Sequence, residues 1–405
     1  MKGKRMHGLC VSRIVKNALT ALLALLIAAA LLCVPGPGRG NAIYAAETAA
    51  RDAMEAPLLF DLAPEARTEF EYATGVDIYH YQDGYVYFSL QDADDYLLVP
   101  EGAAVPEGLG EDVTILHAPL DKIYMAATAC MALVSGIGGL DRVGFSSLTA
   151  DNWYVEAAAR AMEAGDIRFA GKYSEPDFEL LLSGGCDLAV ESTMILHTPK
   201  VQEMIEKLGI PVFIDRSSYE QHPLGRVEWV KVYGALLGLE EEADAFFQKQ
   251  SAVMDELQDF ENTGKTVAFF SLHSNGTVSV RRNRDYVPKM IELAGGVYAL
   301  DGVEALADTK SSSVNLTMEE FYAAAADADY LVYNGTIEVP IHSIDELLEM
   351  DPLLGKFKAV QEGNVWCADK YLYQATDLTG ELIRDFHHML TDEDEEQMTF
   401  LYKCS

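Results

Sequence analysis

The sequence lacks the compact signatures of catalysis. It contains no GxSxG motif, no P-loop and no glycine-rich dinucleotide fingerprint. The glycine-rich stretch Gly136-Ile137-Gly138-Gly139 follows a predicted helix instead of opening one, so we interpret it as a helix stop. These absences argue against an enzyme, although an enzyme with dispersed catalytic residues stays open as an alternative.

Cysteines and clustered metal ligands are also scarce. The cysteines beyond the N-terminal segment are too sparse for a disulfide framework and have no metal-ligand spacing: Cys130, Cys186, Cys367 and Cys404. We predict the first two as buried apolar residues and leave a bridge between the last two open. No HxH or HExxH motif occurs, which makes bare-metal binding a minor interpretation. Haem ligation by one Tyr or His stays open, because a single axial ligand leaves no spacing pattern.

Positive charge is in short supply. The 405 residues include 30 Lys and Arg against 64 Asp and Glu, a formal net charge of -34. Long-range repulsion therefore disfavours nucleic acid and anionic lipid surfaces as partners, and the charge fits solubility outside the cell. The length and the 49% hydrophobic content suit two domains with proper cores.

The N-terminus predicts export. Basic residues from Lys2 to Lys16 precede the apolar run Ala18 to Val34, which is the layout of a secretory signal. Cleavage could follow Ala42 or Ala45, and neither site is a clean one. Lipidation at Cys33 and an uncleaved membrane anchor remain alternatives, since the run is just long enough to span. We expect an extracytoplasmic protein with residues 1–45 as signal or anchor.

Residues 68–99 predict β-structure. Aromatic and β-branched residues alternate there with polar ones, and Asp83-Gly84 is a hairpin signal between two such runs. We expect a linker and a small N-terminal β appendage within residues 46–115.

The rest of the chain alternates strand and helix patterns around one long helix. Residues 240–260 contain no Gly or Pro, and their apolar positions form a single helical stripe. Thr128 is placed to cap the first helix of the α/β pattern. The predicted fold class is α/β: two doubly wound lobes, residues 116–238 and 263–405, bridged by a long rigid α-helix within 239–262.

The order of these units resembles the substrate-binding proteins of ABC importers for ferric siderophores, haem and vitamin B12. The first half carries the resemblance in KIYMAAT, LVSGIGGLDRVGF, FELLLSGGCDLAVES, KLGIPVFID and PLGRVEWVKVYGALLGLEEEADAFF, and the second half in VPKMIELAGG, LTMEEFYAAAADADYLVYNG and GNVWCAD. It covers residues 122–390 and rests on order and spacing, since no single motif is diagnostic. It implies a monomer with an interlobe cleft and little hinge closure. It also implies no intrinsic cofactor and, as transported ligand, an iron chelate, haem or a corrinoid.

Loops after the strands should supply the ligand contacts, because open α/β sheets bind ligands beyond the carboxyl ends of their strands. Aromatic rings there would contact a planar ligand, and arginines would donate to anionic oxygens. The candidates in the first lobe are Trp153, Tyr154, Lys172, Tyr173, His197, Arg216, Tyr219 and His222. Those in the second lobe are His273, Arg281, Arg282, Tyr371 and Tyr373. Any one of them could instead pack in the core or face solvent.

The resemblance also implies a membrane partner, an ABC permease whose arginines meet one acidic residue from each lobe. The matching positions are Glu179 and Glu320, with Glu319 as rival of the latter. Thr317-x-x-Glu320 is also a capping box, which gives Glu320 a purely structural alternative. The predicted function is ligand capture for an ABC importer. An exported adhesin or sensor, or an enzyme on the same scaffold, is the alternative.

Overall fold

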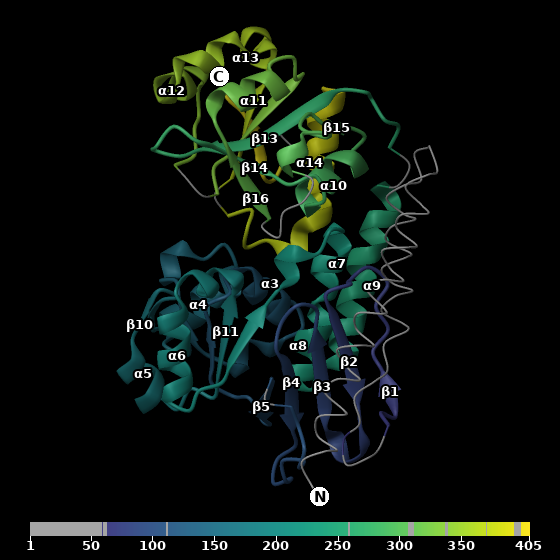
Figure 1. The fold of residues 1–405 in the computed structure, drawn as a ribbon, viewed down its shortest axis with the longest axis vertical. Coiled ribbons are helices and arrows are strands. Elements are labelled where there is room, and N and C mark those ends of the chain that lie inside the picture. Colours follow the sequence, from purple (N-terminus) through teal and green to yellow (C-terminus); the bar gives the residue numbers. More distant parts are fainter. Residues whose placement is uncertain are drawn as a thin grey trace, which may run out of the picture.

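The computed structural model describes residues 59, 63–110, 112–257, 260–306, 312–336, 339–369, 371–392 and 398–405. The predicted signal segment and Cys33 lie outside the described residues. No helix in the described part of the chain is both long enough and apolar enough to cross a membrane. Figure 1 shows two α/β lobes, one above the other, which confirms the predicted fold class.

The first lobe is built on a parallel sheet with the strand order β12-β11-β6-β7-β8. The middle of β11 is fully buried, as expected for a strand with helices over both faces. The strands are β6 (Ile123–Met125), β7 (Val143–Ser146), β8 (Arg168–Phe169), β11 (Leu188–Ser192) and β12 (Val212–Asp215). The helices are α3 (Thr128–Gly136), α4 (Glu156–Ala164), α5 (Phe178–Ser183) and α6 (Pro199–Lys207), and a short hairpin joins β9 (Gly171–Lys172) to β10 (Glu175–Pro176).

The predicted β region is confirmed as a five-stranded sheet in chain order. Its strands are β1 (Ala66–Arg67), β2 (Val76–His80), β3 (Val86–Leu90), β4 (Asp95–Val99) and β5 (Val113–His117). Asp83 and Gly84 lie in the turn between the antiparallel strands β2 and β3, and both have positive φ. The sheet does not stand apart from the first lobe. Phe88 and Tyr96 pack against Phe213 of β12, with ring centroids 6.5 and 4.6 Å away.

Two buried carboxylates fasten this sheet to the lobe. Glu228 is fully buried and accepts hydrogen bonds of 2.8 Å from the backbone N–H groups of residues 71, 72 and 73. Glu220 accepts from the N–H groups of Thr74 and Gly75 and from the indole of Trp229. Lys231 Nζ lies 2.9 Å from Glu228 and compensates its charge. We call this contact the seam.

Three consecutive helices, α7 (Pro223–Glu228), α8 (Val230–Leu237) and α9 (Glu240–Leu257), lead from the first lobe to the second. The helix α9 packs against α7 and α8 on one side and against α14 of the second lobe, and Figure 1 shows it running along the side of the molecule. The helix was predicted over residues 240–260; α9 covers Glu240–Leu257 of it, and residues 258 and 259 lie outside the described residues. Gly234 permits close packing in this bundle, since a Cβ there would lie 2.6 Å from the Ala243 Cβ.

The second lobe carries a mixed sheet with the order β16-β14-β13-β17-β18-β19, and β15 pairs with β13. Parallel pairing is confined to β13 with β15 and β17 and to β17 with β18. The strands are β13 (Thr266–Leu272), β14 (Val278–Arg281), β15 (Val297–Tyr298), β16 (Ser313–Leu316), β17 (Tyr330–Asn334), β18 (Val365–Ala368) and β19 (Leu401–Lys403). The helices are α10 (Tyr286–Leu293), α11 (Met318–Ala325), α12 (Ile344–Met350), α13 (Lys358–Glu362) and α14 (Thr379–Thr391).

Two smaller predictions can be checked here. Thr128 does not cap α3: the N-cap residue is Ala127, and no side chain accepts a hydrogen bond there. All four cysteines outside the N-terminal segment are free and buried, which confirms the interpretation of Cys130 and Cys186. The bridge between Cys367 and Cys404 that the sequence left open is not formed.

Candidate ligand site between the lobes

The lobes meet at residues 371–376, which follow β18 and which we call the strap. The Gln374 side chain is fully buried and spans the junction. Its Nε2 donates to the carbonyl oxygen of Asn152, and its Oε1 accepts from the N–H of Tyr154, both at 2.9 Å. Thr376 Oγ1 donates to the carbonyl oxygen of Ala129 at 3.0 Å. Three hydrogen bonds therefore join the strap to the first lobe.

Predicted ligand-binding tyrosines from both lobes come together at the strap. The ring of Tyr154 lies 5.8 Å from the ring of Tyr371 and 5.8 Å from that of Phe400, centroid to centroid. The Tyr373 hydroxyl accepts a hydrogen bond of 3.2 Å from Gln374 Nε2. Burial raises the pKa of Tyr154, so its hydroxyl stays protonated at neutral pH. The junction thus contains aromatic surface with neutral polar tips.

Arginines gather on the other side of the junction. Arg226 of α7 is 7% exposed, with its guanidinium carbon 4.4 Å from the centre of the Tyr286 ring, and Arg281 approaches the same ring at 5.7 Å. Asp285 caps α10 and has Oδ2 3.9 Å from Arg281 Nη1. Burial raises the pKa of Asp285, and the charges of the arginines oppose that shift. Two guanidiniums beside one carboxylate leave an excess of positive charge that suits an anionic ligand.

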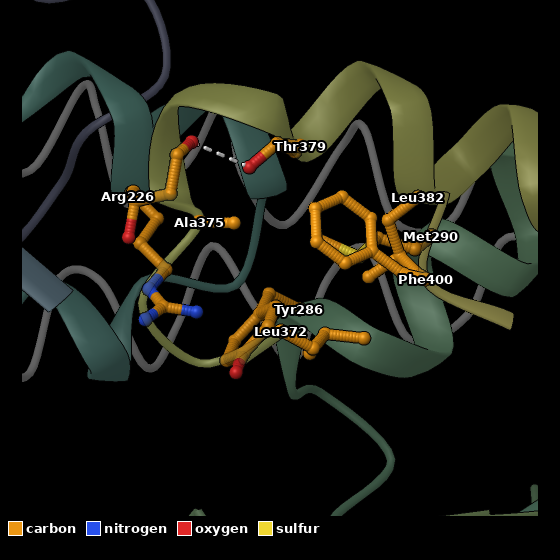
Figure 2. A pocket seen from close by; sticks show the side chains of 9 residues that line it. Arg226, Tyr286, Met290, Leu372, Ala375, Thr379, Leu382 and Phe400 are labelled. Atoms are coloured by element: carbon orange, nitrogen blue, oxygen red, sulfur yellow. Dashed lines mark hydrogen bonds between the residues drawn. The ribbon is translucent and has the colours of Figure 1, made fainter. Parts of the chain in front are cut away.

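Figure 2 shows the cavity at this junction, where the Arg226 guanidinium lies beside the Tyr286 ring. Its volume is about 10 Å³, room for about one water molecule. It is lined by Arg226, Tyr286, Met290, Leu372, Ala375, Thr376, Thr379, Leu382 and Phe400. Small-molecule sites measure roughly 300 to 1,000 Å³, so this cavity by itself is too small to hold such a ligand.

The other arginine and tyrosine candidates lie at the carboxyl end of β12 and opposite it. The Arg216 guanidinium carbon is 5.0 Å from the centre of the Tyr219 ring. Arg282 Nη2, from the second lobe, donates to the carbonyl oxygen of Tyr219 at 3.3 Å. The structure therefore brings Arg216, Tyr219 and Arg282 to a second contact between the lobes.

The remaining first-lobe candidates are not part of these contacts. Lys172 and His197 are exposed, on β9 and at the end of a 3-10 helix (Thr193–His197), and Tyr173 packs on the apolar cluster beneath α5 and α6. Among the described residues, no hydrogen bond or ring contact joins these three to the strap. In the second lobe, the N–H of His273 donates to Thr277 O in the turn from β13 to β14.

Two candidates turn out to be structural. Trp153 is 6% exposed, packs in the core of the first lobe and donates its indole N–H to Ser146 Oγ at 3.0 Å. His222 caps α7 by accepting from the N–H of Leu224 and stacks on Tyr72. Burial lowers the pKa of His222 to about 3, so its ring is neutral at physiological pH. Both side chains therefore have structural contacts, and their contact with a ligand stays a prediction.

The two predicted docking carboxylates differ in their surroundings. Glu179 is exposed in the first turn of α5. Glu320 completes the predicted capping box: Thr317 N–H donates to Glu320 Oε2 at 2.8 Å, and the Thr317 hydroxyl accepts from the N–H of Glu320 at 3.2 Å. These bonds lower the pKa of Glu320.

Three residues of this region were missed by sequence reasoning. Gln374 lies in a loop with no local pattern, and Arg226 lies in a segment that contributed only to the family resemblance. Glu191 carries a signal that could have been used, a charge at the end of the apolar strand DLAVES. It is fully buried, and neither carboxylate oxygen has a hydrogen-bond partner among the described residues. No group of three or more His, Cys, Asp or Glu in the described ranges is arranged to hold a metal ion.

Two α/β lobes, a helix packed against both and a junction of aromatic and cationic side chains define a two-lobe binding protein. A family model described as periplasmic binding protein matches residues 133–372, more than half of the chain. The chain therefore belongs to the periplasmic binding protein family, which places it among substrate-binding proteins and not among enzymes.

Individual relatives are distant. An uncharacterised lipoprotein of Methanocaldococcus jannaschii is 26% identical over 321 residues, 76% of this chain and 72% of that protein. A periplasmic heme-binding protein from Pseudomonas aeruginosa has a TM-score of 0.55 and 15% identity, over 70% of this chain and 98% of its own. An ABC transporter substrate-binding protein from Listeria monocytogenes EGD-e has a TM-score of 0.52 and 15% identity, over 67% and 99%. At these identities the solved structures show the shared fold alone.

Proposed function

We propose that this protein is the extracytoplasmic substrate-binding component of an ABC importer. It captures an iron chelate, haem or a ferric siderophore, or else a corrinoid, between its lobes and delivers it to a membrane permease. The observation that carries the proposal is the junction itself: Tyr154 and Tyr371 from different lobes meet there, and Arg226 and Arg281 lie around the Tyr286 ring on its other side. Aromatic faces suit a planar or apolar ligand, and the arginines suit its anionic groups.

The comparisons support the transport part of this proposal. One solved protein of the same fold is named as an ABC transporter substrate-binding protein, and another as a periplasmic heme-binding protein. The relative named as a lipoprotein supports export with attachment to a membrane, by cleavage and lipidation or by a retained anchor. Among the cargo classes we favour an iron chelate with carboxylate or catecholate oxygens, because the junction has an excess of guanidinium groups. We propose residues 116–238 and 263–405 as the two ligand-binding lobes of a monomer.

Thermal unfolding of the mature protein in the presence of candidate cargoes tests the function. The probes are haemin, a ferric hydroxamate, a ferric catecholate and cobalamin, each at the same concentration. A ligand at about 100 times its Kd stabilises a protein by about 2.7 kcal/mol, so one class should raise the Tm clearly. Tyr371→Ala should reduce that shift. Tyr322→Ala, a half-buried tyrosine packed on Phe357 in the second lobe, is the matched control and should not. No shift with any probe would favour the adhesin or sensor alternative.

Docking to the permease is proposed through Glu179, with Glu320 as the second-lobe counterpart. Glu179→Arg should reduce uptake in cells and leave cargo binding by the purified protein unchanged, since exposed charges act mainly on association. Glu203→Arg, an exposed glutamate on α6, is the control for reversal of charge on the same lobe. Normal uptake by Glu179→Arg would remove this residue from the docking surface.

A further inference from the structure

A groove lies at the opposite end of β12 from the contacts between the lobes. It has β5 on one side and the end of α6 with the start of β12 on the other, and its volume is about 490 Å³. Sites for small molecules measure roughly 300 to 1,000 Å³, so this groove is large enough to hold a ligand. We call it the edge groove.

The edge groove follows the edge of a sheet. The strands β5 and β12 are each the terminal strand of their sheet, and Figure 1 shows β5 on the side of its sheet toward the first lobe. Ile115 packs on one face of the sheet and Leu116 on the other, so Thr114 shares the face of Leu116. Since both Thr114 and Ile115 line the groove, it runs along the edge of β5.

The backbone of β5 is available for pairing at this edge. Asp112 O and the N–H of Ala118 are bonded to β4, and alternation along the strand turns the N–H and C=O groups of Ile115 and His117 away from β4. No hydrogen bond joins these groups to another described residue. The sequence of β5 contains neither Lys nor Pro, the residues that commonly protect an exposed edge.

The start of β12 adds a backbone donor on the other side of the edge groove. Pro211 O accepts a hydrogen bond of 2.9 Å from the N–H of Ala189 in β11. The same alternation therefore turns the N–H of Val212, which lines the groove, away from β11. Backbone groups from two sheets can thus meet one extended chain.

Two carboxylates make the edge groove acidic. Asp187 Oδ2 accepts from the backbone N–H groups of Asp121 and Lys122 at 2.7 and 3.0 Å, whereas its Oδ1 is buried and has no hydrogen-bond partner among the described residues. Glu206 is exposed near the end of α6. None of the described residues that line the groove is Lys or Arg. Its charge therefore favours a cationic ligand.

We propose that the edge groove binds an extended, basic segment of a partner protein. The segment pairs with the free edge of β5 and places a Lys or Arg side chain at Asp187 and Glu206. A peptide fits better than a small organic cation, because a cation alone would leave the backbone groups of the edge without partners. The periplasmic binding protein model matches residues 133–372, so β5 lies outside the match. The site is thus an addition to the family fold, and it does not depend on the cargo.

Calorimetric titration of the mature protein with synthetic hexapeptides tests the proposal. The basic probe alternates Val with Lys. A second probe has Glu in place of each Lys, and a third keeps the Lys residues but carries N-methyl groups on its backbone. Spermidine represents a small organic cation. We expect the basic probe to bind, and the acidic and N-methylated probes to bind at least about tenfold more weakly.

Variants of the protein locate the binding. His117→Pro removes an N–H group from the free edge and should weaken the basic probe about tenfold, while His117→Ala, which removes the imidazole and keeps the N–H, is its control. Asp187→Asn combined with Glu206→Gln should also weaken it about tenfold. The control for the lost charges is Glu163→Gln with Glu203→Gln, two exposed glutamates that do not line the groove.

Three results would overturn the proposal. One is no binding of the basic probe at about 1 mM. Another is binding of spermidine as tight as that of the basic probe with no effect of His117→Pro, which would indicate a site for a small organic cation. The third is an equal loss in the groove pair and in the control pair, because that indicates general attraction to the negative net charge. None of these measurements uses a cargo, so they are independent of the test of the proposed transport function.

Discussion

Glu228 at the seam and Glu191 near the carboxyl end of β11 are both fully buried carboxylates of the first lobe. Glu228 receives three backbone N–H groups and an ammonium group. Glu191 has no hydrogen-bond partner for either oxygen among the described residues, and burial raises its pKa to about 8. A buried glutamate side chain therefore stabilises the folded state at position 228 and destabilises it at position 191.

The two glutamates therefore contribute differently to the first lobe: Glu228 contributes to its stability, and Glu191 does not. A buried carboxylate that is fully hydrogen-bonded holds two segments together, whereas an unpaired one is destabilising unless it becomes protonated. Unpaired buried groups with shifted pKa values occur most often where a ligand binds. Glu191 lies at the carboxyl end of a parallel strand, which is the position where open α/β sheets bind ligands.

Glu228→Ala should give the largest effect on this comparison. It removes a buried carboxylate that accepts from three backbone N–H groups and pairs with Lys231, which we expect to cost about 4 kcal/mol of unfolding free energy. Denaturant titration measures the loss. Glu203→Ala, an exposed glutamate paired only with Lys207, should change stability by less than about 0.5 kcal/mol. A loss below about 1 kcal/mol for Glu228→Ala would show that the seam does not depend on this carboxylate.

Glu191→Gln should remove a pH dependence from the stability of the protein. The pKa of Glu191 is raised in the folded state, from 4.5 to about 8. Its protonated form therefore supports folding fully below about pH 4.5, and this support is lost as pH rises through about 8. In that window the unfolding free energy of the unsubstituted protein, relative to that of Glu191→Gln, should fall by about 1.4 kcal/mol per pH unit. The total fall from pH 5.5 to 7.5 is then about 3 kcal/mol. If the unfolding free energies of the two proteins changed with pH in the same way, Glu191 would not be an unpaired buried carboxylate.

Tyr96→Phe should give the smallest effect. The Tyr96 hydroxyl accepts a hydrogen bond of 3.1 Å from the N–H of Ile214 across the seam, and the ring packs on Phe213. Removing the hydroxyl keeps the ring and should cost about 1 kcal/mol. Tyr322→Phe is the control on the second lobe. A loss as large as that of Glu228→Ala would mean that the seam is held by this bond more than by the carboxylates.

The sequence predicted what local patterns encode. The apolar stripe of residues 240–260 predicted α9, and the alternation of residues 68–99 predicted β2 to β4. The missed contacts depend on pairing between distant segments. Glu228 binds residues 155 to 157 positions earlier in the chain, and Gln374 binds Asn152 across 222 positions. No helical or strand period links such positions, so their partners become visible only in the folded structure.

Because Glu228 lies far along the chain from its partners, the ribosome makes the partners well before it makes Glu228. The strands β1 to β5 leave the ribosome well before the carboxylates that fasten them, because Glu71 precedes Glu228 by 157 residues. Until residues 213–228 are made, the N–H groups of residues 71–75 lack the carboxylates of Glu220 and Glu228, and the rings of Phe88 and Tyr96 lack Phe213. Contacts of such long range close slowly. The emerging N-terminal sheet is therefore the part of this chain most exposed to wrong pairing with other chains, and the part that gains most from a chaperone.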